Sequence, residues 1–219
     1  MDRCVMPAID LALLSAAFVT FFVVIDPIGV MPIFAGLTQG TSAAHRRKMA
    51  IKSVLIATII LLGFAYGGEW LLSALGVSLD AFRAAGGVLL FLLALDMIFE
   101  KRTERREDRA GKLHGEGEHA PEDISVFPMA IPMLAGPGAI ASIMLYMSGS
   151  GGDWATQGVV LAAMAANLIV CLVLFLAAGP LMRVMGDTVA AMITRILGVI
   201  LAALAAQFIF DGIAGALLG

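Results

Sequence analysis

Two segments rich in proline and glycine interrupt long apolar stretches of the chain. The first reads DPIGVMP and runs from Asp26 to Pro32, and the second reads PMAIPMLAGPG and runs from Pro128 to Gly138. Proline removes a backbone donor and clashes with the preceding helical turn, so it breaks or kinks a helix and frees carbonyl groups. A break also creates a new helix N-terminus, whose N–H groups attract an anion such as a carboxylate.

Asp26 is the residue in these segments with the most chemical capacity. It stands between Ile25 and Pro27, inside an apolar stretch. An acid in hydrocarbon costs on the order of 3 kcal/mol by insertion scales unless it is paired, hydrated or protonated. Asp26 can therefore bind an ammonium group or a cation, or carry a proton. It can equally cap the helix that follows Pro27, and the two roles do not exclude each other.

The remaining candidate site residues lie at the breaks or inside apolar spans. Asn167 can line a site or join helices by hydrogen bonds. Arg83 and Arg195 can pair with Asp26 or with a substrate carboxylate, as an ion pair or a gate, or can extend to the membrane interface. The candidate substrate-binding set is Asp26, Pro27, Gly29, Pro32, Pro132, Gly136, Pro137, Gly138 and Asn167.

The composition shows what must position these residues. Of the 219 residues, 60% are apolar and 14% are charged, and the mean hydropathy is +0.97. A soluble domain has roughly 45–50% apolar and about 25% charged residues. Several apolar runs exceed the roughly 18 residues needed to cross a bilayer, and they are apolar on all faces, which favours helices over barrel strands. We therefore expect an all-α, multi-pass membrane protein embedded in the lipid bilayer.

Six membrane spans and one polar loop are expected. The loop covers residues 100–123 and separates a first three-helix unit, residues 1–99, from a second, residues 124–219. The expected spans are residues 9–37, 51–72, 81–99, 124–147, 157–182 and 189–218.

The two units resemble each other weakly. When Arg83 is aligned with Arg195, Gly86 falls on Gly198, and when Pro27 is aligned with Pro132, Pro32 falls on Pro137. Because three spans is an odd number, the second unit must insert upside down. Inverted repeats with paired interrupted helices are typical of secondary transporters, whose substrate sites lie where the breaks meet.

Lys and Arg residues are unevenly distributed along the chain, which indicates the orientation. With Arg83 and Arg195 set aside because they begin spans, only Arg3 lies on the side of the termini. The turns after the first, third and fifth spans hold Arg46, Arg47, Lys48, Lys52, Lys101, Arg102, Arg105, Arg106, Arg109, Lys112 and Arg183. By the positive-inside rule, both termini should be outside and the 100–123 loop cytoplasmic.

Several classes of function are disfavoured. A net charge of −3 does not suit a nucleic-acid partner. Cys4 and Cys171 have no partner spacing, so neither a disulfide framework nor a metal site is indicated. No enzyme signature, catalytic residue or cofactor-binding loop is recognisable. We therefore expect a non-enzyme, and any transport should be driven by a solute or ion gradient.

Three blocks of the chain together resemble the MarC family: residues 21–34 (FFVVIDPIGVMPIF), 82–91 (FRAAGGVLLF) and 128–138. The resemblance covers nearly the whole chain. It implies a six-span protein of the inner (cell) membrane of a bacterium or archaeon, and some relatives are described as transporters of small neutral amino acids such as glycine and alanine. Many relatives carry Asn where this chain has Asp26, and an acid there favours an ammonium group or a cation.

The resemblance and the breaks together predict secondary transport of a small amino acid, with H⁺ or Na⁺ as the coupling ion. An exporter or channel for inorganic ions or another small solute, and a membrane protein that transports nothing, stay open as alternatives. A homo-oligomer also stays open.

Overall fold

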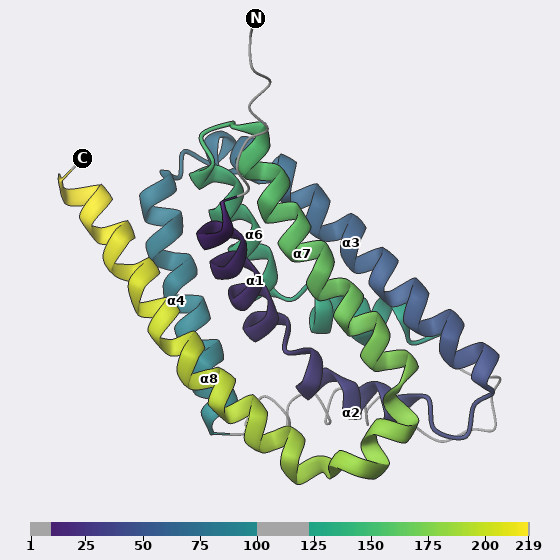
Figure 1. The fold of residues 1–219 in the computed structure, drawn as a ribbon. Helices are drawn as coiled ribbons and strands as arrows, with labels where there is room; N and C mark the ends of the chain where they lie inside the picture. Colours follow the sequence, from purple (N-terminus) through teal and green to yellow (C-terminus); the bar gives the residue numbers. More distant parts are fainter. Residues whose placement is uncertain (1–9, 100–122, 219) are drawn as a thin grey trace, which may run out of the picture.

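The computed structural model describes residues 10–99 and 123–218, which form helices and no strands. Figure 1 shows them as a bundle in which α1 is surrounded by the other long helices. In chain order the helices are α1 (Leu11–Ile25), α2 (Pro27–Leu37), α3 (Ala43–Ala74), α4 (Leu79–Ile98), η1 (Ser125–Leu134), α6 (Pro137–Gly149), α7 (Trp154–Leu176) and α8 (Ala178–Leu218).

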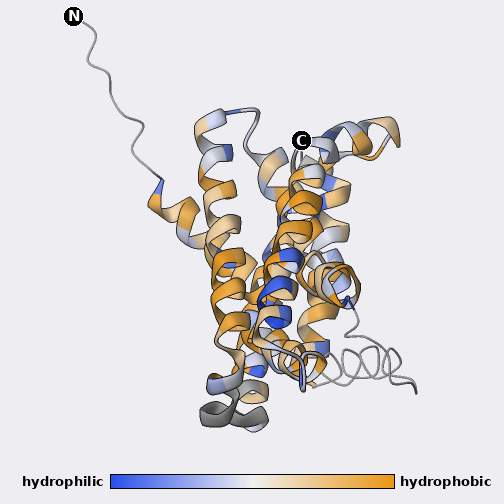
Figure 2. Ribbon diagram, turned by 90° about the vertical axis from the view of Figure 1, so that its right-hand side faces the viewer, coloured by the Kyte–Doolittle hydropathy of each residue, from blue (hydrophilic) through white to orange (hydrophobic). Residues whose placement is uncertain are grey.

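The all-helical, multi-pass membrane fold is confirmed. Five helical stretches are long and apolar enough to cross a bilayer, with α1 and α2 counted as one. The bent pair of η1 and α6, with 56° between its members, makes a sixth. Figure 2 shows that hydrophobic residues make up most of the length of the helices. Outward-facing apolar side chains such as Ile59 and Val199, 65% and 61% exposed, suit contact with lipid.

The helix boundaries differ from the expected ones at two places. α3 begins at Ala43, so the basic residues from Arg46 to Lys52 belong to its first turns and do not form a separate turn. α7 ends at Leu176, and α8 then runs for 41 residues, longer than a membrane crossing requires. α1 begins and α8 ends at the same end of the bundle, away from the start of α3 (Figure 1). Most of the expected 100–123 loop lies outside the described residues.

The helices of the two units pack against each other in a reciprocal pattern. α1 and α2 contact α7, while η1 and α6 contact α3, which is the corresponding helix of the other unit. The most extensive packing is between α4 and α8. This pattern is the one that an inverted repeat would give, although the repeat itself stays a prediction.

Two glycines make the reciprocity specific in α4 and α8. A Cβ on Gly87 would meet the carbonyl of Ala205 and the backbone and side chain of Ile209. A Cβ on Gly198 would meet the Cβ of Met97, the carbonyl of Ala94 and the side chain of Ile98. An alignment of Gly87 with Gly198 places Ala94 on Ala205 and Ile98 on Ile209, so these contacts are interchanged between the two helices. The contacts therefore favour this alignment over the expected alignment of Gly86 with Gly198, which differs from it by one position.

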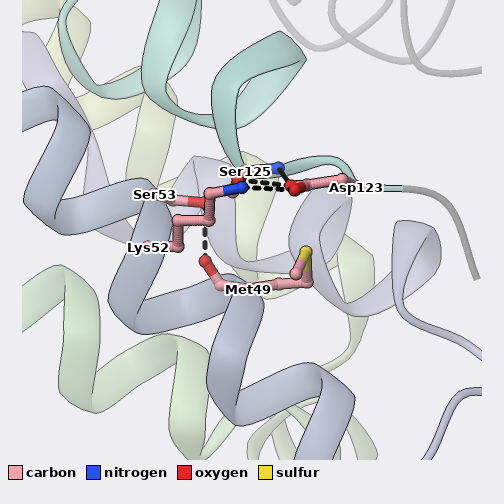
Figure 3. Close-up of polar contacts among 5 residues, drawn as sticks. All are labelled: Met49, Lys52, Ser53, Asp123 and Ser125. Carbon is pink, nitrogen blue, oxygen red and sulfur yellow. Dashed lines mark hydrogen bonds and ion pairs between the residues drawn. The ribbon is translucent and has the colours of Figure 1, made fainter.

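A polar contact fixes the start of the second broken crossing to α3 (Figure 3). Lys52 donates to the carboxylate of Asp123, which also accepts from the hydroxyl of Ser125 and, at 3.1 Å, from its backbone N–H. These bonds hold the pKa of Asp123 at about 2, below the ordinary 3.8, with the Lys52 hydrogen bond as the largest cause. The chain is therefore anchored just before η1 begins.

Candidate binding site at the helix breaks

Asp26 forms the whole break in the first crossing. Its backbone lies in the left-handed region, with φ 55° and ψ 65°, a conformation that Asp tolerates better than most residues. Its N–H donates to the carbonyl of Phe22 and ends α1, while its carbonyl accepts from the N–H of Val30 and begins α2, both at 3.0 Å. Pro27 then occupies the first helical position, where no N–H is needed. The predicted break is confirmed at this single residue.

The side chain of Asp26 connects this break to the second unit. Asp26 is fully buried, and its Oδ1 accepts from the N–H of Gly29 at 3.0 Å. The hydroxyl of Thr194, in α8, lies 3.3 Å from Oδ1 and 3.4 Å from Oδ2. Asp26 is thus the N-cap of α2, as one of the two sequence hypotheses holds. The cap places the Asp26 carboxyl group in the interior of the protein.

Gly29 is required by the position of that carboxylate. A Cβ at this residue would lie 2.1 Å from Asp26 Oδ2 and 2.8 Å from Thr194 Oγ1. Real side chains essentially never approach so closely, so the space beside the Cα of Gly29 belongs to these two polar groups. Asp26, Gly29 and Thr194 therefore form one compact unit.

The second break differs from the first in both its backbone and its cap. η1 is irregular, with extended backbone at Phe127 and Ile131 before cis peptide bonds to Pro128 and Pro132. α6 then begins at Pro137, and the N–H of Ile140 donates to the carbonyl of Gly136 at 3.0 Å. Gly136 has no side chain, so this helix start has no side-chain cap.

The two helix starts favour a different alignment of the prolines from the expected one. Pro27 and Pro137 both stand at the first position of a helix, whereas Pro132 does not, so the structure favours pairing Pro27 with Pro137. Pro32 lies inside α2, which continues to Leu37, so no second break occurs there. The proline spacing alone misled because Pro132 belongs to the irregular η1.

The two broken crossings meet at the start of α6. A Cβ on Gly138 would lie 2.9 Å from the side chain of Val24, two residues before Asp26, and would also touch Leu90 and Leu93 of α4. Gly138 is buried, whereas Pro137 is exposed. The structure thus brings Gly138 close to the end of α1. The structure also brings Pro132 next to Gly136, because a Cβ on Gly136 would lie 2.5 Å from the Pro132 carbonyl oxygen.

Asn167 belongs to α7 and lies beside α1, and its side chain has a fixed orientation. Both of its amide hydrogens are used, because Nδ2 donates to the carbonyl of Phe18 at 3.0 Å and to that of Ala163 at 2.9 Å. Its Oδ1 is buried and has no hydrogen-bond partner within the described ranges. Asn167 therefore joins α7 to α1, and it presents an acceptor two turns of α1 away from Asp26.

The two arginines lie in different surroundings. Arg83 forms an ion pair with Asp80 of its own helix at 3.5 Å. Arg195 follows Thr194 on α8, at an exposed position. When Gly87 is aligned with Gly198, the residue that corresponds to Arg83 is Thr194, so the two arginines do not occupy equivalent positions.

Sequence reasoning missed Thr194, the residue that reaches Asp26 from the other unit. A threonine in an apolar helix is a weak signal, and the adjacent Arg195 drew the interpretation away from it. The only signal available was its place near the start of the sixth span, at the depth where α8 meets the broken crossing. Only the packing of α2 on α8 makes the contact visible.

The comparisons with known proteins agree with this architecture. A sequence model described as MarC family integral membrane protein matches residues 11–217. A UPF0056 membrane protein of Methanocaldococcus jannaschii is 37% identical over 212 residues, 95% of this chain and 100% of the relative. A UPF0056 membrane protein of Archaeoglobus fulgidus is 36% identical, with 93% of each chain covered. UPF0056 membrane protein YhcE of Escherichia coli is 35% identical, with 90% of each covered.

No solved structure matches this chain. The relatives come from bacteria and archaea and are named as membrane proteins. The match over almost the whole length, together with the helical architecture, confirms the resemblance seen in the three sequence blocks. The chain belongs to the MarC family of integral membrane proteins.

Proposed function

We propose that this chain is a secondary transporter of small neutral amino acids such as glycine and alanine in the cell membrane of a bacterium or archaeon. The observation that carries the proposal is the contact of the second broken crossing with the end of the first, where a Cβ on Gly138 would lie 2.9 Å from Val24, two residues before the buried Asp26. Discontinuous helices that meet inside the membrane are the usual setting of a transporter's substrate site.

The chemistry of the two breaks suits the two ends of a zwitterion. At the start of α2 the N–H of Gly29 is already bonded to Asp26, so this end offers a negative charge. At the start of α6 there is no side-chain cap, so this end offers helix N–H groups and the positive end of the dipole. We place the ammonium group at Asp26 and the carboxylate at Gly136–Gly138.

The surroundings of the α6 start favour a small substrate. Val24, Leu90 and Leu93 pack around Gly138, at 2.9–3.3 Å from where a Cβ on this residue would lie. These side chains are apolar, so they suit a hydrogen atom or a methyl group on the substrate better than a charged side chain. This is why we propose glycine and alanine in preference to larger or charged amino acids.

The coupling ion and the orientation are parts of the same proposal. A solute gradient coupled to H⁺ or Na⁺ would drive transport, since no catalytic step is proposed for this chain. Arg46, Arg47, Lys48 and Lys52 lie in the first turns of α3, at the end of the bundle away from where α1 begins (Figure 1). We propose that this end is cytoplasmic and that the termini are outside.

The test is a binding and transport series on purified protein. Thermal unfolding in detergent is measured with glycine, alanine, leucine and glutamate, and with Na⁺ against K⁺. Uptake of labelled glycine into liposomes is then measured under H⁺ and Na⁺ gradients. We expect stabilisation and uptake with glycine and alanine only, and loss of both in Asp26→Ala. Failure of every amino acid to bind would refute the proposal, and stabilisation by a cation alone would favour ion transport.

A further inference from the structure

The buried threonine of α8 is the element of the break that the proposed function leaves unused. Thr194 is 3% exposed, and its hydroxyl lies within 3.4 Å of both oxygens of Asp26. The two residues are 168 positions apart and belong to different units. We infer that Thr194 is a positioning residue that holds the Asp26 carboxylate ready for the substrate ammonium group. This inference rests on the proposed function of Asp26.

The geometry shows what the hydroxyl adds to the N-cap. The N–H of Gly29 bonds Oδ1 and so restrains the carboxylate from the side of the α2 start. The Thr194 hydroxyl sits between Oδ1 and Oδ2 and so restrains both oxygens. A carboxylate held from two directions keeps its oxygens in one orientation, which lowers the ordering cost of binding a cation.

The packing keeps the hydroxyl in that place. A Cβ on Gly29 would lie 2.8 Å from Thr194 Oγ1, so the threonine hydroxyl rests directly over the backbone of the α2 start. α2 packs along α8 as well as α7. Any movement of α8 relative to α2 therefore changes the restraint on Asp26. Release of the carboxylate would then accompany a movement between the two units, which is what a transport cycle requires of its substrate site.

The substitutions Thr194→Val and Thr194→Ser separate the hydroxyl from the packing. Valine keeps the shape and removes the hydroxyl, whereas serine keeps the hydroxyl and removes the methyl group. Thr58→Val is the matched control, because the Thr58 hydroxyl donates only to Val54 of its own helix, at 2.8 Å. We expect Thr194→Val to raise the KM for glycine uptake about tenfold, with maximal velocity within about twofold, as loss of one hydrogen bond to a charged group predicts.

Thr194→Ser should keep the KM within about threefold of the wild type, and Thr58→Val should leave it unchanged. Equal losses in the serine and valine variants would assign the effect to packing, and a wild-type KM in Thr194→Val would also overturn the inference.

A second measurement does not depend on amino acid transport. Thermal unfolding of the wild type, Asp26→Ala, Thr194→Val and the double variant forms a double-mutant cycle. We expect the two substitutions to be clearly non-additive, because each removes the same contact. If the wild type moves no amino acid but the coupling is present, the proposed function fails and the contact between the units stands. If the coupling is absent, the inference fails whatever the transport result.

Discussion

An alanine at position 29 tests the geometry of the break most sharply. Its methyl group would lie 2.1 Å from Asp26 Oδ2 and 2.8 Å from Thr194 Oγ1, so the carboxylate must leave its position. Overpacking costs roughly 1–3 kcal/mol. Loss of the N-cap costs about 1 kcal/mol more, and the better helix propensity of alanine returns up to about 1 kcal/mol. We expect Gly29→Ala to lower the free energy of unfolding by roughly 1–3 kcal/mol.

The same substitution at Gly36, in the same helix, is the matched control. A Cβ there would meet nothing within 4 Å, so Gly36→Ala should be neutral or up to about 1 kcal/mol more stable. Unfolding can be followed with a thiol-reactive fluorogenic dye, because Cys171 is fully buried. A Cys4→Ser background leaves Cys171 as the reporter.

Two results would contradict this reasoning. Gly29→Ala could prove as stable as the wild type, which would mean that the carboxylate does not occupy the space beside the Gly29 Cα. Alternatively, the loss could be the same in an Asp26→Ala background. Removal of the carboxylate should relieve the closer of the two contacts, so we expect the cost of Gly29→Ala to fall by at least half there.

Three further predictions concern the scaffold around the breaks. The pKa of Asp123 is about 2 against an ordinary 3.8, so its contact with Lys52 stabilises the fold above about pH 4, and this stabilisation is lost as the pH falls toward 2. In thermal unfolding, Lys52→Met should therefore be less stable than the wild type at pH 6. This difference in stability should disappear at low pH. Gly87→Ala should destabilise by roughly 1–3 kcal/mol, because the added methyl group meets the backbone of α8, whereas Gly63→Ala, with nothing within 4 Å, should not, and equal melting temperatures would contradict this. Asn167→Asp should be less stable than Asn167→Ala, because carboxylate oxygens would face the two carbonyls to which the Asn167 amide donates. The reverse order of melting temperatures would contradict these hydrogen bonds.

The membrane fold could be predicted from the sequence because it depends on few, additive properties. Run length and hydropathy alone predict the crossings, since lipid permits no lipid-exposed irregular backbone. The break at Asp26 was also predictable, because an acid followed by proline can neither continue a helix nor remain unpaired in hydrocarbon. The α2 start shows the N-cap that this residue pair predicts.

The alignment of positions between the two units could not be predicted from residue identities alone. Arg83 and Arg195 are identical residues at similar places, yet the helix faces in contact align Gly87 with Gly198 and so place Arg83 on Thr194. A shift of one residue turns a helix by about 100°, which moves a side chain to a different face. Pro32 and Pro132 misled for a related reason, since a proline breaks a helix only where its surroundings do not keep the helix continuous.

The partners of the candidate site depend on packing that no local pattern encodes. The contact of Thr194 with Asp26 spans 168 residues, and that of Gly138 with Val24 spans more than a hundred. Both arise because α1 and α2 pack on helices of the other unit. In an apolar sequence many arrangements of six spans bury comparable surface, so hydropathy cannot choose among them.

Disulfide cross-linking in native membranes tests most directly whether the two broken crossings meet. Val24→Cys and Gly138→Cys would be combined in a background with Cys4→Ser and Cys171→Ala, with a protease site inserted within residues 100–122. Because a Gly138 Cβ would lie 2.9 Å from the Val24 side chain, a mild oxidant should join the cysteines and hold the two proteolytic fragments together on a non-reducing gel. The control pair of Val24→Cys and Gly158→Cys also spans the cleavage site, and it should let the fragments separate because a Cβ on Gly158 would meet nothing within 4 Å. Separate fragments from the Val24–Gly138 pair, under oxidation that leaves the protein folded, would contradict a shared site at the breaks.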